Sequence, residues 1–199
     1  FPVTEGLYKK PTVVNNVETL AAATGILLNG AEKFSSIGNK KSAGTKLVCL
    51  DSFFNKPGVY EIDMGTPMKK IFEEFGGGLK EEVKAFQIGG PLGGVVPVKE
   101  IEKLNLDFQE FTAAGFMLGH ASVVSIPKNF SMAEYIHHLF EFSAEESCGK
   151  CFPGRLGSYR GKEMFDQLKK GTSKIPLKLL NELLITMKKG CLCALCGAI

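Results

Sequence analysis

The stretch KLVCLDSFFNKPGVYEI, residues 46–62, holds two short apolar runs separated by turn-forming residues. The first run, 46–50, and the second, 58–62, have the composition of β-strands. The sequence Asn-Lys-Pro-Gly at 55–58 is typical of a tight turn. The pattern therefore predicts a β-hairpin.

The residues after the hairpin predict a mixed unit. Thr66 is expected to cap a helix with Pro67 at its first position, and apolar residues then recur at helical spacing until the three glycines at 76–78. A further strand is predicted at 85–88. A hairpin, a helix and more strands, in this order, indicate an α+β architecture with a small β-grasp (ubiquitin-like) domain over residues 45–110.

The last third of the chain changes to a helical period. Ser131 and Glu134 form a capping box at the start of a helix. Two more helices are predicted, one from about residue 155 to residue 170 and one over the leucine-rich stretch 179–187. An all-α helical bundle is therefore expected over residues 131–199.

The remaining segments are expected to connect these units. Residues 1–44 hold too few apolar side chains for a core of their own, so they should lean on another part of the protein. Residues 111–130 are expected to form a linker and a strand. The chain begins without Met, which suggests a piece of a longer polypeptide.

Composition excludes several classes of protein. The 199 residues carry a net charge of only +3, and charges of both signs interleave along the chain, which argues against a nucleic-acid partner. No apolar run is long enough to insert into a membrane. The cysteines lie in closely spaced groups rather than spread as staples, which favours a reducing compartment. We expect a cytoplasmic protein, either free or peripheral to a membrane complex.

Five of the six cysteines lie in the last quarter of the chain, at positions 148, 151, 191, 193 and 196. A four-iron cluster needs four thiolates around one small volume, and a helical hairpin brings two such groups together. Their order is unusual for zinc, which stays the alternative metal. The histidines at 137–138 are expected to be ordinary helix residues. Cys49, in an apolar strand, is expected to be a small buried residue.

The segments ESCGKCFPGRLG (146–157) and GCLCAL (190–195) resemble the cluster-binding part of the NADH-oxidising flavoprotein subunit of respiratory complex I. The same type of subunit occurs in NAD-reducing hydrogenases and in NAD-dependent formate dehydrogenases. KPTVVNNVETL (10–20) and QIGGPLGG (87–94) extend the resemblance over nearly the whole chain. The continuation RLGSYRG (155–161) looks closer to the formate dehydrogenase branch than to complex I itself.

The resemblance implies an order of domains and the cofactors that two of them bind. In this family an N-terminal domain binds FMN and NADH, a soluble-ligand-binding β-grasp domain follows, and a helical bundle holds one [4Fe-4S] cluster. Residues 1–44 would then be the tail end of the flavin domain, and Asn15, Asn16 and Thr19 would contact the phosphate or ribityl chain of FMN. The piece alone would not be an active enzyme without the flavin domain. Its partners would be other subunits of an NADH-oxidising or NAD-reducing complex, including a thioredoxin-like [2Fe-2S] subunit.

One position departs from the family pattern C-x₂-C-x₂-C, because Gly154 stands where the third cysteine is usual. The expected ligands are Cys148, Cys151 and Cys193, with Cys196 preferred over Cys191 as the fourth. Electrons would pass from FMN to this cluster and on to partner subunits. The alternative is a module without a cluster, or with zinc, that serves as a structural docking part of a multisubunit complex.

Overall fold

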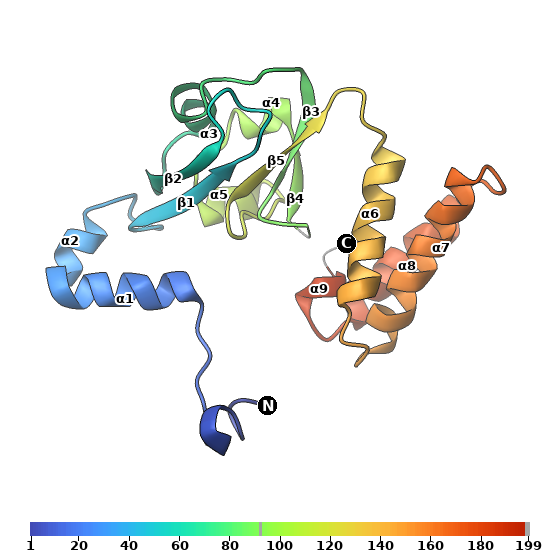
Figure 1. The fold of residues 1–199 in the computed structure, drawn as a ribbon, viewed down its shortest axis with the longest axis horizontal. Helices are drawn as coiled ribbons and strands as arrows, with labels where there is room; N and C mark the ends of the chain where they lie inside the picture. The colour runs from blue at the N-terminus through green and yellow to red at the C-terminus, as the bar shows by residue number, and fades with distance from the viewer. Residues whose placement is uncertain (92, 198–199) are drawn as a thin grey trace.

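The computed structural model describes residues 1–91 and 93–197 and contains three parts (Figure 1). We call them the arm (residues 1–44), the sheet unit (residues 45–127) and the bundle (residues 132–197). In chain order the elements are η1 (Leu7–Lys9), α1 (Val17–Asn29), α2 (Ala31–Ser35), β1 (Thr45–Leu50), β2 (Gly58–Asp63), α3 (Met68–Lys70), η2 (Ile71–Phe75), β3 (Val83–Ile88), β4 (Gly94–Pro97), α4 (Val98–Ile101), α5 (Phe108–Ala113), β5 (Ser122–Pro127), α6 (Met132–Glu146), η3 (Pro153–Gly157), α7 (Ser158–Lys169), α8 (Leu177–Gly190) and α9 (Ala194–Gly197).

The sheet unit is a mixed five-stranded sheet with the order β2-β1-β5-β3-β4. β1 and β2 form the predicted antiparallel hairpin, with Leu47 opposite Glu61. β5 lies parallel to β1 and antiparallel to β3, so the segment 111–130 contributes a strand to the middle of the sheet. The expected α+β class, a β-grasp unit followed by helices, is confirmed.

The residues of β1 alternate between the core and the solvent. Val48 and Leu50 are buried, whereas Leu47 is half exposed. Cys49 shares the outer face with Leu47 and is exposed, so the expectation of a buried Cys49 is wrong. The period of two in a strand decides this outcome, because one face of the sheet cannot hold both Val48 and Cys49.

Aromatic rings from a loop, a helix and a strand meet in the core of the sheet unit. The ring centroids of Phe54 and Phe72 lie 5.1 Å apart, and those of Phe72 and Phe86 lie 4.7 Å apart. The predicted cap at Thr66 is wrong, since α3 begins after Pro67 without a side-chain cap. The Thr66 hydroxyl instead donates to the carbonyl of Asp63 at 2.8 Å and closes the turn that follows β2.

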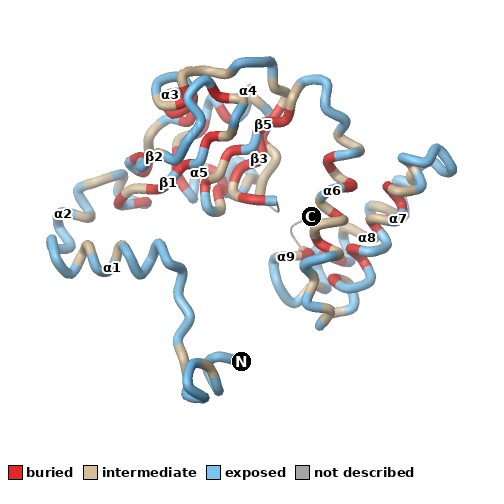
Figure 2. Tube along the Cα trace, viewed as in Figure 1, coloured by how far each residue is buried: buried red, intermediate tan, exposed pale blue. Residues whose placement is uncertain are grey.

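The bundle starts where the capping box predicts, since the Ser131 hydroxyl accepts from the Glu134 N–H at 3.4 Å. α6 packs along α7, with the rings of Phe140 and Phe165 5.9 Å apart. Gly161 makes this close approach possible, because a Cβ there would lie 2.1 Å from the Phe140 ring. Figure 2 shows the buried residues concentrated in the sheet unit and inside the bundle.

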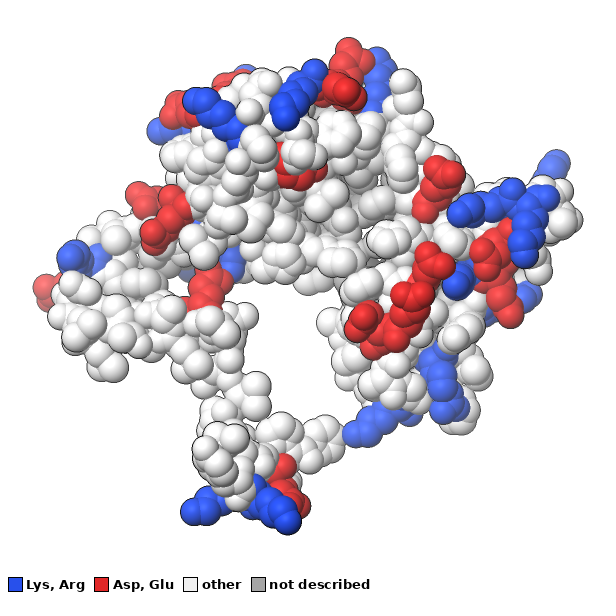
Figure 3. Space-filling view, viewed as in Figure 1, with Lys and Arg blue, Asp and Glu red and all other residues white. Residues whose placement is uncertain are grey.

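The arm is largely exposed, and the space-filling view shows an opening between it, the sheet unit and the bundle (Figure 3). No residue of α1 or α2 is buried. Phe34 of α2 packs on Gly44. At the start of the chain, the Phe1 ring lies 4.3 Å from the Nζ atom of Lys150 in the bundle. In the part of the chain that the structure describes, no helix is long and apolar enough to cross a membrane.

Candidate metal centre

The two cysteine segments meet at one end of the bundle. Cys148 and Cys151 lie between α6 and η3, and Cys191, Cys193 and Cys196 follow the end of α8. η3 contacts both α8 and α9. The contact is close, since a Cβ on Gly190 would lie 2.9 Å from the Pro153 ring. The fold of the bundle therefore brings together two cysteine segments that lie about forty residues apart in the sequence.

Gly154 lies at the centre of this junction and is buried. A Cβ at this position would lie 2.9 Å from the sulfur of Cys151 and 3.3 Å from the sulfur of Cys196. The two sulfur atoms thus converge on the same point from different segments. Cys196 is only 3 % exposed, and its sulfur lies next to the space that the side chain of a larger residue 154 would enter.

Backbone N–H groups surround the Cys151 sulfur. The N–H groups of Leu192 and Gly154 lower the pKa of the Cys151 thiol, because they stabilise the negative thiolate. Burial raises the pKa of the Cys191 thiol to about 11, and the nearby Cys151 sulfur adds to this effect. The pKa values of these two neighbouring thiols are therefore shifted in opposite directions.

Cys148 and Cys193 lie at the rim and are exposed. The loop at Cys148 is held by Arg155, whose Nη1 donates to the carbonyl of Gly149 at 3.2 Å. Within residues 1–91 and 93–197, no three Cys, His, Asp or Glu side chains are gathered closely enough to hold a single metal ion. The structure places the Cys151 sulfur near that of Cys191, and the Cys151 and Cys196 sulfurs both near Gly154, without forming a finished metal site.

The donor set fits an iron–sulfur cluster by its chemistry. All five candidate side chains are thiols, the ligands that such clusters use. Basic residues outnumber acidic ones from residue 147 onward, and Figure 3 shows Lys and Arg side chains at the lower end of the bundle. Positive charge and N–H donors both favour the negative charge of a thiolate-bound cluster.

Comparison with known proteins agrees with this chemistry. Residues 134–199 match the family described as the NADH-ubiquinone oxidoreductase-F iron-sulfur binding region. Most of the chain is similar to F subunits of NADH-quinone oxidoreductases and to a hydrogenase subunit. The resemblance inferred from the motifs is thereby confirmed.

Three relatives show how far the similarity extends. The NADH-quinone oxidoreductase F 2 subunit of Rhizobium meliloti is 45% identical over 159 residues, covering 79% of this chain and 38% of that protein. The HndC subunit of the NADP-reducing hydrogenase of Solidesulfovibrio fructosivorans is 35% identical over 198 residues, covering 98% of this chain and 40% of that protein. The crystal structure of an NAD⁺-reducing [NiFe]-hydrogenase in the H₂-reduced state matches with a TM-score of 0.85 at 29% identity, covering 100% of this chain and 34% of that one. The chain thus spans about two fifths of the length of the curated relatives.

The residues expected at the flavin lie far from the thiols in the fold. Asn15, Asn16 and Thr19 are exposed at the start of α1. Asn16 caps the helix, since its Oδ1 accepts from the Glu18 N–H at 2.8 Å. In Figure 1, α1 and the bundle stand on opposite sides of the opening. An arm in this position presents its amides on a surface separate from the cysteine junction.

Two polar contacts were missed by the sequence analysis. The Nε2 of His137 lies 2.7 Å from Oδ1 of Asp166 and joins α6 to α7. The Nζ of Lys46, on β1, contacts a carboxylate oxygen of Glu18, on α1. The first pair joins residues too distant in sequence for any local pattern to reveal. The second had a visible signal, because Lys46 occupies the same face of its strand as Val48 and Leu50.

Proposed function

We propose that this chain is the electron-transfer part of an NADH:acceptor oxidoreductase flavoprotein subunit. Its bundle would hold a [4Fe-4S] cluster that takes electrons from FMN and passes them to partner subunits. One observation carries the proposal, namely the convergence of the Cys151 and Cys196 sulfur atoms on Gly154. The match of this region to an iron–sulfur binding family supports it.

The ligand set that we propose is Cys148, Cys151, Cys193 and Cys196. Cys196 compensates for the glycine at position 154, because its buried sulfur reaches the space next to that residue. Cys191 is the second candidate for the fourth ligand. The cluster, when bound, supplies one-electron chemistry.

The groups around the sulfur atoms would tune the reduction potential of the cluster. The N–H groups of Leu192 and Gly154 point at the Cys151 sulfur and would remain its hydrogen-bond donors when it binds iron. Such donors stabilise the more negative, reduced state and raise the reduction potential. The Arg155 contact to Gly149 holds the loop that carries Cys148.

The proposal also covers the cofactors, domain boundaries, partners and location of the full-length parent, which are inferred from similarity to the family. In the full-length parent, FMN and NAD would bind the flavin domain, with Asn15, Asn16 and Thr19 near the FMN. The proposed division is a flavin-domain tail at 1–44, a β-grasp domain from 45, and a cluster bundle from 131. Partners would be other subunits of the complex, including a thioredoxin-like [2Fe-2S] subunit. The grouped cysteines favour a location in the cytoplasm or on its side of a membrane complex.

Iron content tests this proposal directly. Anaerobically purified protein is expected to be brown, to contain about four irons and four sulfides per chain, and to give an EPR signal after reduction. Cys196→Ser is expected to lose most of this iron, whereas Cys191→Ser keeps most of it. Cys49→Ser, an exposed cysteine on the sheet, is the matched control. Colourless protein with no iron, or with one zinc, would favour the structural docking module instead.

A position swap tests the role of Cys196 more sharply. Cys196→Gly alone is expected to lose the cluster, and the double variant Gly154→Cys, Cys196→Gly is expected to regain it. Gly154→Cys alone crowds the site, because the added Cβ lies 2.9 Å from the Cys151 sulfur and 3.3 Å from that of Cys196. If the double variant stays as iron-free as Cys196→Gly, the two positions do not substitute for one another and this assignment is wrong.

A further inference from the structure

Lys46 is a charged residue on the inner face of a strand. Its side chain is 8% exposed, and the next residues on the same face of β1 are the buried Val48 and Leu50. An apolar residue would serve the core better at this position, since burying an ammonium group without a partner is costly. A buried ammonium group at this position therefore needs a partner of opposite charge, which the apolar core does not offer.

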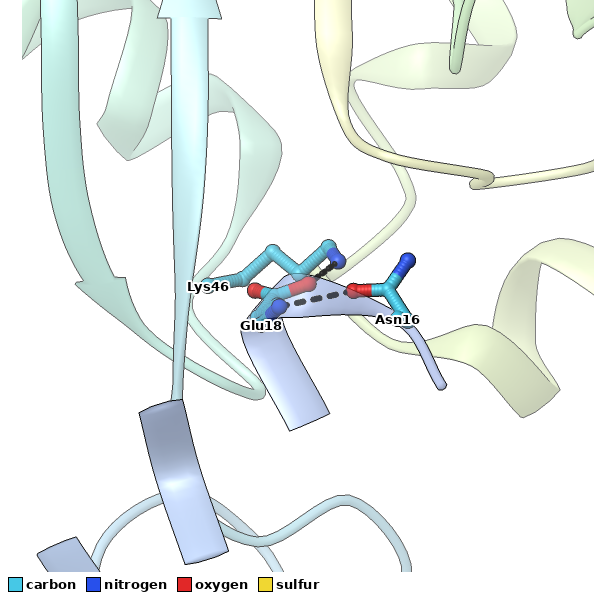
Figure 4. A network of polar contacts seen from close by, with 3 residues as sticks. All are labelled: Asn16, Glu18 and Lys46. Carbon is cyan, nitrogen blue, oxygen red and sulfur yellow. Dashed lines mark hydrogen bonds and ion pairs between the residues drawn. The ribbon is translucent and has the colours of Figure 1, made fainter. Parts of the chain in front are cut away.

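The partner of Lys46 lies in the arm. Figure 4 shows the Lys46 side chain reaching from β1 to the carboxylate of Glu18, in the first turn of α1. The Nζ also lies 5.5 Å from the centroid of the Phe108 ring. Glu18 is tied in turn to Asn16, because the Glu18 N–H donates to the Asn16 side chain. The ammonium group is thus linked to the capping residue of α1.

α1 has few contacts that could hold it against the sheet unit. No residue of α1 is buried, so apolar packing does not hold the helix. Among the described residues, the Lys46–Glu18 pair is the one hydrogen bond or ion pair between α1 and the sheet unit. Without this pair, α1 would be held mainly by its covalent connection to the rest of the chain and by its contact with α2.

We propose that Lys46 and Glu18 are positioning residues, which set the first turn of α1 against the sheet unit. That turn lies beside Asn15, Asn16 and Thr19, so the pair would hold the flavin-contacting side chains at a fixed place relative to the rest of the subunit. This last step rests on the function proposed above. The contact between helix and sheet does not depend on it.

The two partners differ in exposure, and the difference separates positioning from simple stabilisation. The Glu18 side chain is 44% exposed, so it returns to water when Lys46 is replaced. The buried Lys46 side chain cannot reach water in the same way. Removal of the Glu18 charge therefore leaves a buried ammonium group without a compensating charge. Lys46→Met is therefore expected to release α1 with little change in the melting temperature. Glu18→Gln is expected to release α1 and also to lower the melting temperature of the sheet unit.

Hydrogen exchange of the 199-residue chain measures the release. Both variants are expected to speed amide exchange in the first two turns of α1 by about tenfold, while β3 and α7 stay unchanged. Glu32→Gln, which removes the same charge from the first turn of α2, is the matched control and leaves exchange in α1 unaltered. Unchanged exchange in α1 of Lys46→Met would overturn the proposal. Equal losses of melting temperature in both variants would also overturn it.

The flavin-bearing full-length protein tests the consequence. Lys46→Met is expected to weaken FMN retention by about tenfold with the iron per chain unchanged, and Lys46→Arg, which keeps the charge, is expected to restore part of it. Faster exchange in α1 with unchanged FMN retention would overturn the link to the flavin. Absence of iron from every form, including the parent, would instead contradict the proposed function and leave the exchange result standing.

Discussion

The sheet unit and the bundle are stabilised in different ways. Among the described residues, the core cluster of the sheet unit contains 18 buried side chains, including the rings of Phe54, Phe86 and Phe111. The bundle's cluster contains five in the described part of the chain, and one of these is the thiol of Cys196. Large apolar side chains such as Leu177 and Ile185 remain substantially exposed on α8. Apolar burial thus suffices for the sheet unit, whereas the bundle has a smaller core that ends at the cysteine junction.

This difference predicts that metal binding and folding are coupled in only one of the two regions. A small core gives little stability, and a bound metal adds its binding free energy to that of folding. The junction of η3, α8 and α9 adds several thiols, among them the buried Cys196, to one end of this small apolar core. Loss of the cluster should therefore loosen the bundle and leave the sheet intact.

The largest expected effect comes from removing the metal. Stripping iron with a chelator under reducing, anaerobic conditions is expected to abolish slow amide exchange in α7 and α8, while β1, β3 and β5 stay protected. Cys151→Ser should have the same effect without a chelator, and Cys49→Ser should have none. Hydrogen exchange followed by mass spectrometry measures both regions at once. Full protection of α7 in iron-free protein would show that the bundle's own core suffices.

A core truncation in the sheet unit tests the opposite dependence. Phe111→Ala removes a fully buried ring and is expected to cost about 3–5 kcal/mol of the free energy of unfolding. The iron content per chain should stay unchanged, because Phe111 belongs to the sheet cluster and not to the bundle. Denaturant unfolding and an iron assay measure the two quantities. Loss of iron in this variant would show that the two regions fold as one.

Local patterns predict much of this architecture. The hairpin at 45–63 follows from two apolar runs and a turn, and α6 begins at the capping box of Ser131. The place of β5 does not follow from any local pattern, since its neighbours β1 and β3 lie more than thirty residues away. The start of α5 had a signal, because Asp107 accepts from the Gln109 and Glu110 N–H groups as a cap. That cap was missed, although it lies within the predicted β-grasp domain at 45–110.

A larger side chain at the α6–α7 contact should have an intermediate effect. Gly161→Ala places a Cβ 2.1 Å from the Phe140 ring, so the helices must separate, at a cost of about 1–3 kcal/mol. The bundle alone is expected to lose stability and some of its iron. Gly25→Ala in α1 is the control, because nothing lies within 4 Å of a Cβ there. Thermal unfolding that stays unchanged in Gly161→Ala would contradict the close packing of α6 and α7.

The candidate site was predictable in composition and less so in detail. The grouped cysteines predict a metal centre, and Gly154 departs from the cysteine pattern of the family that the chain resembles. Only the fold shows that the Cys196 sulfur lies beside Gly154, since a chain reversal at α9 decides it. Lys46 was visible as a charge among core positions of a strand. Its partner Glu18 was not, because the two residues belong to different parts of the fold.

Acid should weaken the bundle through Asp166. The hydrogen bond from His137, strongest among its causes, holds the pKa of the Asp166 carboxyl below its usual value. A depressed pKa means that this contribution is present above the unfolded value near 3.9 and is lost as the pH falls through the folded value. Asp166→Asn is therefore expected to flatten the loss of bundle stability at acid pH. Acid titrations of α7 exchange that are identical in both proteins would contradict this role.

The smallest expected effect comes from Tyr135, where α6 packs against the sheet. Its hydroxyl is buried without a hydrogen-bond partner among the described residues, and burial raises its pKa to about 12. Because the folded value lies above the unfolded value near 10, the contribution of the neutral phenol is lost between about pH 10 and pH 12. Tyr135→Phe is expected to gain about 1 kcal/mol at neutral pH and to remove this alkaline loss. In contrast, Tyr60→Phe should lose stability, since the Tyr60 hydroxyl donates to the Lys56 carbonyl at 2.9 Å. Alkaline unfolding curves compare the two, and a destabilised Tyr135→Phe would reveal a hydrogen bond at that hydroxyl.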